Sequence, residues 1–187
     1  MSRVTVLVGS PRRDGNTDLL ARAFAEGAGA SHEVSLISAA SLDIHPCLGC
    51  NACYASEGHR CFQRDGMDQV YERLLRTDIL VLASPVYFYG ISAQLKTLID
   101  RLHAPLRDQF PIRKLGLILV GAARLPELFD PILLQYRMLL EFFQLEDGGT
   151  VLVRGCRDKG DVRRTDGLRQ ARELGARIAQ PTGGSHA

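Results

Sequence analysis

Short apolar runs alternate with amphipathic helical segments along the chain, and this alternation limits the possible folds more than any other feature. Runs rich in Val, Ile and Leu are typical of strands buried on both faces of a sheet. They occupy residues 4–8, 34–37, 79–83, 115–120 and 150–153. Apolar residues spaced by three and four predict helices within 17–24, 67–75, 91–102, 132–143 and 168–178. Five such units predict an α/β fold, a doubly wound parallel sheet with helices on both faces.

The size and charge of the chain limit its organisation and its partners. Within the 187 residues we find no linker or repeat, so residues 1–180 are predicted to form one domain, followed by a disordered tail at 181–187. A formal net charge of only +2 argues against nucleic acid or an anionic membrane as partner. The apolar run at 4–8 is too short for a signal peptide, and no apolar run approaches a membrane span. The sequence therefore predicts a cytoplasmic protein.

The loop after the first predicted strand has the composition of a phosphate-binding loop. In doubly wound sheets, ligands bind beyond the carboxyl ends of the strands, where the winding reverses direction. Residues 9–17 read GSPRRDGNT, and they combine hydroxyl, amide and backbone N–H donors at the start of a helix. Neither a G-x-G-x-x-G fingerprint nor a P-loop lysine is present. The loop therefore argues against NAD(P) bound in the Rossmann manner and against hydrolysis of a nucleoside triphosphate.

The loop after the third predicted strand favours a planar ligand. It contains three consecutive aromatic residues, Tyr87, Phe88 and Tyr89, which are unusual at an exposed strand end unless something flat covers them. A flavin ring is one such cover, and a neighbouring helix or a partner subunit is the alternative. Because this loop and the phosphate loop flank the same reversal point, a ligand with a phosphate tail and a planar head would bridge them. The sequence therefore predicts FMN.

Four cysteines, Cys47, Cys50, Cys53 and Cys61, crowd the segment after the second predicted strand. In a reducing cytosol, clustered thiols indicate metal or redox chemistry rather than disulfides. The short gaps suit the thiolate ligands of an iron–sulfur cluster, with a loop of free thiols and a zinc site as the alternatives. Because the segment follows a strand end, we expect it on the same edge of the sheet as both flavin loops.

With these residues in view, the chain resembles the flavodoxin-like NAD(P)H-dependent FMN reductases, and within them the iron–sulfur flavoproteins. The resemblance covers residues 3–153 and is carried by the loop at 9–17, the cysteine motif, the segment 65–68 and the segments 84–87 and 94–96. It implies a five-stranded sheet in the order 2-1-3-4-5, FMN at the strand ends and a homo-oligomer. It also implies a [4Fe–4S] cluster on Cys47, Cys50, Cys53 and Cys61. Phosphate contacts are implied for Ser10, Arg12, Asn16 and Thr17, and ring contacts for Pro85, Val86, Tyr87, Phe88, Tyr89 and Gly90.

The loop after the fourth predicted strand departs from this resemblance. Such loops are often glycine-rich in the family, whereas residues 121–126 read GAARLP and carry a charge. We include Gly121 and Arg124 among the candidate flavin contacts, because a cation near the N1/C2 edge would stabilise a reduced anionic ring. A solvated loop arginine is the alternative interpretation of Arg124.

These observations predict an FMN-dependent oxidoreductase in which a [4Fe–4S] cluster relays electrons to FMN. No side chain is predicted to be catalytic, because the flavin itself carries the electron or hydride chemistry. NAD(P)H or a ferredoxin-type protein is the expected electron donor, and a homodimer or homotetramer is the expected assembly. Two alternatives remain: a plain NAD(P)H:FMN or quinone reductase without metal, and a non-catalytic electron carrier or thiol redox sensor.

Overall fold

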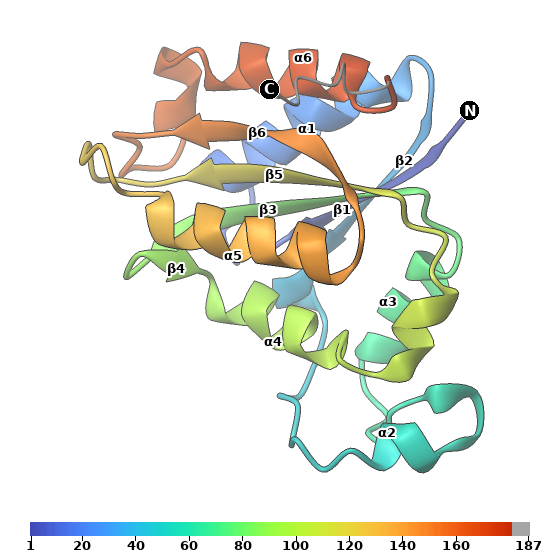
Figure 1. The fold of residues 1–187 in the computed structure, drawn as a ribbon. Coiled ribbons are helices and arrows are strands. Elements are labelled where there is room, and N and C mark those ends of the chain that lie inside the picture. Colours follow the sequence, from blue (N-terminus) through green and yellow to red (C-terminus); the bar gives the residue numbers. More distant parts are fainter. Residues whose placement is uncertain (181–187) are drawn as a thin grey trace.

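A twisted sheet with five parallel strands in the order β2-β1-β3-β5-β6 forms the centre of the molecule (Figure 1). The computed structural model describes residues 1–180, so the tail expected at 181–187 lies outside the described residues. The parallel strands are β1 (Arg3–Val8), β2 (Glu33–Ser38), β3 (Ile79–Tyr87), β5 (Lys114–Val120) and β6 (Glu146–Val153). Counted along the chain, their order is the predicted 2-1-3-4-5, and the α/β fold class is confirmed.

One further strand was not predicted. β4 (Gly90–Ile91) pairs antiparallel with the end of β3, through Val86 opposite Ile91 and Tyr87 opposite Gly90. Two residues are too few to produce a periodic pattern in the sequence, so only the pairing in the structure reveals this strand. β3 therefore extends four residues beyond the predicted run at 79–83 and ends in a hairpin.

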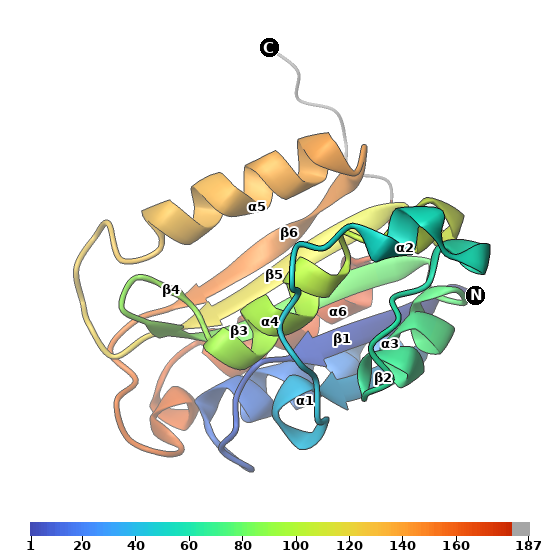
Figure 2. The ribbon, with the colours of Figure 1, turned by 90° about the horizontal axis from the view of Figure 1, so that it is seen from below.

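Helices cover both faces of the sheet (Figures 1 and 2). On one face lie α1 (Asn16–Gly29) and α6 (Gly167–Arg177), packed on a buried apolar cluster that includes Val6, Phe24 and Leu174. On the other face lie α3 (Met67–Leu74), α4 (Ala93–Arg101) and α5 (Asp130–Phe142). Their cluster includes Leu7 and Tyr71. No helix within residues 1–180 is long and apolar enough to cross a membrane.

The two helices on the first face approach each other very closely. A Cβ atom added at Gly27 would lie 2.0 Å from the backbone oxygen of Arg172, and one added at Gly175 would lie 2.1 Å from that of Phe24. Both clashes involve backbone atoms, which a side-chain rotation cannot relieve. The two glycines therefore set the distance between α1 and α6.

The segment after β2 does not stay at the carboxyl edge of the sheet. It runs back beside α4 toward the opposite edge, where α2 (Ala52–Ala55) lies (Figures 1 and 2). Two contacts fix this path: Arg101 at the end of α4 donates to the carbonyl oxygen of His45 at 2.8 Å, and the Gly66 N–H donates to that of Asp43 at 2.7 Å. The expectation that the cysteines share an edge with the flavin loops is therefore wrong, because a strand end fixes only where a connection begins.

Candidate functional site

Two buried serines join the loops after β1 and β3 at the carboxyl edge of the sheet. The Ser92 hydroxyl donates to the carbonyl oxygen of Gly9 at 2.7 Å, and the Ser92 N–H donates to the Ser84 hydroxyl at 2.9 Å. A Cβ atom at Gly9 would lie only 2.5 Å from the Ser92 Oγ, so the contact requires glycine. Ser92 also caps α4, accepting a hydrogen bond from the Leu95 N–H. This role was not predicted, although a serine before an amphipathic helix is a usual cap signal.

The predicted phosphate loop combines groups that face a cavity with groups that hold the loop in place. Ser10 and the exposed Arg12 line a cavity of about 490 Å³ between the end of β1, the start of α1 and the turn after β2. The first N–H groups of α1 have no acceptor within the helix, which suits an anion. Ser10 orders the loop by accepting a hydrogen bond from the Arg12 N–H at 3.2 Å.

The side chains of Asn16 and Thr17, also predicted to bind phosphate, are engaged within the protein. The Asn16 amide donates to the carbonyl oxygen of Asp158 at 2.9 Å and accepts from the Val162 N–H at 3.2 Å. It thereby ties the loop after β1 to the loop after β6. Thr17 is buried. In this conformation their backbone N–H groups, rather than the side chain of Asn16, are available to an anion.

The predicted ring-binding segment, residues 85–90, forms a two-residue hairpin turn with unusual backbone geometry. Phe88 and Tyr89 are its central residues, with φ of 46° and 62°. Positive φ at both positions defines a type I′ turn, which normally favours Asn and Gly. Phe88 is fully exposed, and Tyr87 and Tyr89 are about half exposed. Large aromatic residues in such a strained conformation suggest a function that compensates for the strain.

The loop after β5 lies beside the hairpin. A Cβ atom at Gly121 would lie 2.7 Å from Leu128 and 3.4 Å from Val86, so glycine permits the close approach of this loop to the end of β3. The Arg124 side chain is exposed, and its guanidinium lies against Gly155 in the loop after β6. The loops after β1, β3, β5 and β6 thus meet at the carboxyl edge. The candidate flavin residues come from the first three of these loops.

The four cysteines come together at the other end of α4. Cys47, Cys50, Cys53 and Cys61 line one small cavity, together with Gln63, Arg101 and His103. Burial raises the pKa of the Cys53 thiol, its own backbone amide lowers it, and the three other thiols, Cys61 foremost, raise it further. Two N–H donors point at sulfur: the Gly49 amide lies 3.5 Å from the Cys47 Sγ, and the Gln63 amide 3.9 Å from the Cys61 Sγ.

A buried ion pair supports this cavity. Arg101 and Asp65 have side chains only 2% and 1% exposed, and their Nη1 and Oδ2 atoms lie 2.7 Å apart. Burial would raise the pKa of Asp65, but the hydrogen bonds from Arg101, His45 and Met67 lower it overall. The end of α4 is further anchored by the Tyr71 hydroxyl, which donates to the carbonyl oxygen of Arg101 at 2.8 Å. Burial raises the pKa of Tyr71 to about 12, so it remains a donor.

The chemistry of the donor set suits an iron–sulfur group. Within residues 1–180, no three Cys, His, Asp or Glu side chains already converge at the distances of a bound metal ion. The four thiols nevertheless share one cavity, with amide donors for sulfur and a buried cation beside them. Thiolate ligands with hydrogen bonds to sulfur are the surroundings that such clusters use.

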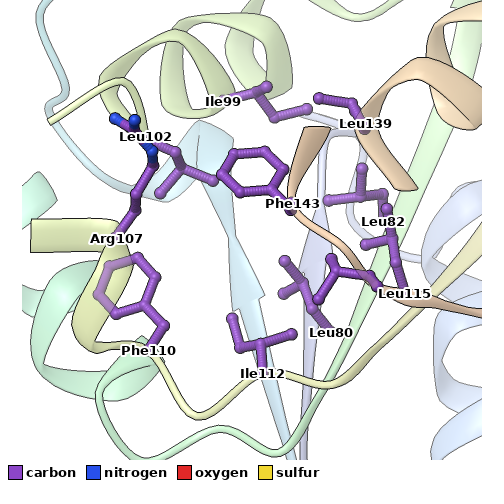
Figure 3. A pocket seen from close by; sticks show the side chains of 11 residues that line it. Leu80, Leu82, Ile99, Leu102, Arg107, Phe110, Ile112, Leu115, Leu139 and Phe143 are labelled. Carbon is purple, nitrogen blue, oxygen red and sulfur yellow. The ribbon is translucent and has the colours of Figure 1, made fainter. Parts of the chain in front are cut away.

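A third cavity, of about 90 Å³, lies between α4, α5 and the amino-terminal halves of β3 and β5 (Figure 3). Its lining is almost entirely apolar, with Leu80, Leu115 and Phe143 pointing into it. Its one charged side chain, Arg107, is held over the ring of Phe142 at 5.4 Å. Because it lacks polar groups that would orient a ligand, we interpret it as imperfect packing rather than a binding site.

The loops predicted to bind flavin and the four cysteines lie at opposite ends of α4. The helix begins beside Gly9 and ends at Arg101 in the cysteine cavity. With nine residues it spans about 14 Å. Within one chain the two candidate sites are therefore separated by at least the length of this helix.

Comparison with known proteins places these features in a family. Residues 2–126 match the family described as NADPH-dependent FMN reductase. An iron–sulfur flavoprotein of Methanocaldococcus jannaschii is 35% identical over 195 aligned positions, which cover 95% of this chain and 96% of the relative. A Bacillus subtilis protein, named as a candidate NAD(P)H-dependent FMN-containing oxidoreductase, is 32% identical over 170 positions, covering 87% and 90% of the two chains.

Solved structures share the fold. The NAD(P)H:quinone oxidoreductase of Methanothermobacter marburgensis superposes with a TM-score of 0.79 at 17% identity, covering 98% of both chains. An FMN-dependent NADH-azoreductase of Bacillus anthracis, solved with FMN, gives a TM-score of 0.69 at 13% identity and covers 96% of this chain and all of that one. At these identities the likeness shows the fold alone.

Proposed function

Because the chain belongs to the NADPH-dependent FMN reductase family and is an FMN-dependent oxidoreductase, we propose that it exchanges electrons between FMN and a [4Fe–4S] cluster on Cys47, Cys50, Cys53 and Cys61. One observation carries the proposal: all four thiols line a single cavity beside the buried Arg101. The Methanocaldococcus relative, an iron–sulfur flavoprotein aligned over nearly the whole chain, supports it. When bound, the flavin supplies the electron or hydride chemistry and the cluster supplies one-electron exchange.

The flavin would be held by the loops at the carboxyl edge. We assign its phosphate to Ser10, Arg12 and the N–H groups at the start of α1, with Asn16 and Thr17 shaping the loop. We assign the ring to residues 85–90 and to Gly121 and Arg124 of the neighbouring loop. Ser84 and Ser92 would hold the loops after β1 and β3 together, because they connect Gly9 to the end of β3.

Cofactor release tests the flavin assignment. Heating the purified protein should release FMN at about one equivalent per chain, identified by chromatography, and stoichiometric FAD would contradict the assignment. Arg12→Glu should weaken FMN retention, because an acidic side chain beside the phosphate repels it. Arg76→Glu is the matched control, since Arg76 is also exposed but follows α3, away from this loop. Equal loss of FMN in both variants would remove Arg12 from the site.

Iron analysis tests the cluster. Anaerobic reconstitution with iron and sulfide should give about four irons per chain, and Cys50→Ala should lower this sharply. Cys156→Ala is the matched control, because this buried thiol lies outside the cysteine cavity, after β6. Zinc at one per chain, or no metal under anaerobic expression, would leave a plain NAD(P)H:FMN or quinone reductase.

The separation of the two sites suggests how electrons would pass between them. Electron transfer slows steeply with distance, and the flavin loops and the cysteines lie at opposite ends of α4. In a two-fold dimer, the flavin edge of one copy can face the cysteine segment of its partner, and this contact then occurs twice. We therefore propose that electrons pass between subunits, and that the donor, NAD(P)H or a ferredoxin-type protein, meets the assembled oligomer.

A further inference from the structure

Arg101 has one buried donor without an acceptor. Its Nη1 donates to the Asp65 Oδ2 at 2.7 Å and to the carbonyl oxygen of His45 at 2.8 Å, and its Nη2 lies 3.4 Å from the Asp65 Oδ1. Its Nε has no partner. Within residues 1–180 it is the only buried side-chain nitrogen or oxygen in this condition.

An unsatisfied buried donor requires an explanation, because it has lost its hydrogen bonds to water without replacement. Arg101 lines the same cavity as the four cysteines, so the side chain that carries the unpaired donor lies beside four sulfur acceptors. Asp65, itself buried, fixes the guanidinium through two of its nitrogens and leaves the third free. The ion pair thus holds the cation in place without using its last hydrogen bond.

We propose that Arg101 is a positioning residue for the iron–sulfur group, donating from Nε to one of its sulfurs and raising its reduction potential. The inference rests on the proposed function, since it requires the cluster. The physical reason is charge: four thiolates give the group a net negative charge, which increases when it accepts an electron. A fixed cation and an N–H donor to sulfur both stabilise the reduced form more than the oxidised form.

The alternative is a purely structural role. The Arg101–Asp65 pair also joins the end of α4 to the cysteine segment, and this alone could account for its burial. A structural role predicts that substitutions lower stability and leave the potential of any cluster that still forms unchanged. The potential therefore distinguishes the two roles, whereas stability and activity do not.

Three variants separate the charge of Arg101 from its Nε donor. Arg101→Lys keeps a positive charge for Asp65 but places a methylene where Nε was. Asp65→Asn/Arg101→Gln keeps an N–H donor near the Nε position and removes the charge. Asp65→Asn/Arg101→Met removes both. The double variants avoid leaving a buried carboxylate unpaired, and Asp65→Asn alone is their reference. Arg64→Gln is the matched control, because Arg64 is exposed, carries the same charge and lies in the same segment.

The experiment uses the complete, anaerobically reconstituted protein. Dithionite supplies the electron in a mediated redox titration, the reduced cluster is followed by electron paramagnetic resonance, and iron and FMN per chain are measured on the same samples. Asp65→Asn/Arg101→Met should lower the equilibrium constant for reduction at least tenfold relative to Asp65→Asn, which is about 59 mV for one electron. Arg101→Lys, compared with wild type, and Asp65→Asn/Arg101→Gln, compared with Asp65→Asn, should each show part of this decrease. Arg64→Gln should change it less than twofold.

The outcomes separate this inference from the proposed function. Wild-type protein without iron would overturn the cluster and, with it, the role of Arg101. Wild-type protein with about four irons, and Arg101 variants with unchanged potentials, would overturn the inference alone. Should the double variants fail to fold, Arg101→Lys decides the question, because it retains the ion pair with Asp65. An unchanged potential in Arg101→Lys would then refute the Nε hydrogen bond.

Discussion

Two residues at the carboxyl edge are of an unusual type for the backbone conformation that they adopt. Phe88 and Tyr89 adopt positive φ in a type I′ turn that would be less strained with Asn and Gly. Their rings are half to fully exposed, so packing within the chain does not compensate for this strain. A bound ring or a partner subunit would compensate for it, in agreement with the proposed function.

Replacing Phe88 and Tyr89 together should increase stability and weaken FMN binding. Phe88→Asn/Tyr89→Gly should raise the free energy of unfolding by roughly 1–3 kcal/mol, because the strain disappears. The same variant should retain less FMN, because both aromatic rings are lost. Denaturant unfolding and FMN content measure the two effects. Phe88→Ala/Tyr89→Ala is the control, since it removes the rings but keeps positive φ on residues with a Cβ atom. An equal gain in stability in this control would show that exposure, not strain, was the cost.

An ion pair at the other edge predicts how stability depends on pH. The Arg3 side chain donates to Asp78 and lowers the pKa of this carboxyl, with further help from the Arg3 N–H, although burial opposes the shift. A carboxyl whose pKa is lower in the folded state contributes stability above its unfolded value, about 3.9. The contribution is lost as the pH falls through the folded pKa, because the unfolded chain then binds more protons.

Asp78→Asn should therefore flatten the acid side of the stability profile. Wild type and variant should differ most at neutral pH and converge below about pH 4, as followed by urea unfolding across pH. Asp43→Asn is the control, because its carboxylate is 91% exposed and its ion pair with His45 is long, at 3.8 Å. A constant difference between wild type and Asp78→Asn at all pH values would show that the substitution acts through something other than this titration.

At the scale of elements, the contact between α1 and α6 depends on two glycines. Helix propensity favours alanine over glycine at an interior position by up to about 1 kcal/mol. At Gly27 and Gly175, however, a Cβ atom would meet backbone atoms of the facing helix near 2 Å. Close packing should outweigh propensity here, because neither backbone can move without separating the helices.

Gly27→Ala should consequently destabilise the protein by about 1–3 kcal/mol, the usual cost of overpacking. Gly29→Ala, two residues later in the same helix, should be neutral or stabilising, since nothing lies within 4 Å of its added Cβ atom. Thermal and denaturant unfolding of the two variants measure the contrast. The interpretation fails if both substitutions change stability in the same direction.

At the scale of the whole molecule, exposed aromatic residues lie at both ends of α4. Tyr87, Phe88 and Tyr89 are at the carboxyl edge of the sheet, and Tyr54 follows Cys53 in α2. Interfaces are enriched in such residues. A two-fold contact that joins the hairpin of one copy to the cysteine segment of the other would cover both groups and shorten the distance between the two proposed cofactors.

The protein should therefore sediment as a dimer or tetramer at micromolar concentration. Phe88→Asp should shift the equilibrium toward monomer, because it places a charge at the fully exposed tip of the hairpin. Leu125→Asp, a similarly charged substitution at a half-exposed residue of the loop after β5, is the matched comparison. A wild-type protein that sediments as a clean monomer would contradict the inter-subunit route for electrons.

Much of the fold followed from the sequence because its signals are local. Each parallel strand and each helix that covers the sheet has a run or stripe of apolar residues, and five alternating units admit few topologies. The family also followed, since its motifs are contiguous. The two-residue β4 did not follow, because two residues are too few to produce a periodic pattern. The bond from Ser92 to Gly9 did not follow either, because its partners are 83 residues apart in the chain.

The sequence by itself determined the parallel sheet, the FMN reductase family and the candidate ligands, because these depend on residue types and short spacings. Only the tertiary structure decided where the candidates lie. The cysteine segment leaves the flavin edge and returns along α4, since the buried pair of Asp65 and Arg101 and the bond to His45 hold it there. No local pattern encodes that path, because its partners are 36 and 56 residues apart in the chain.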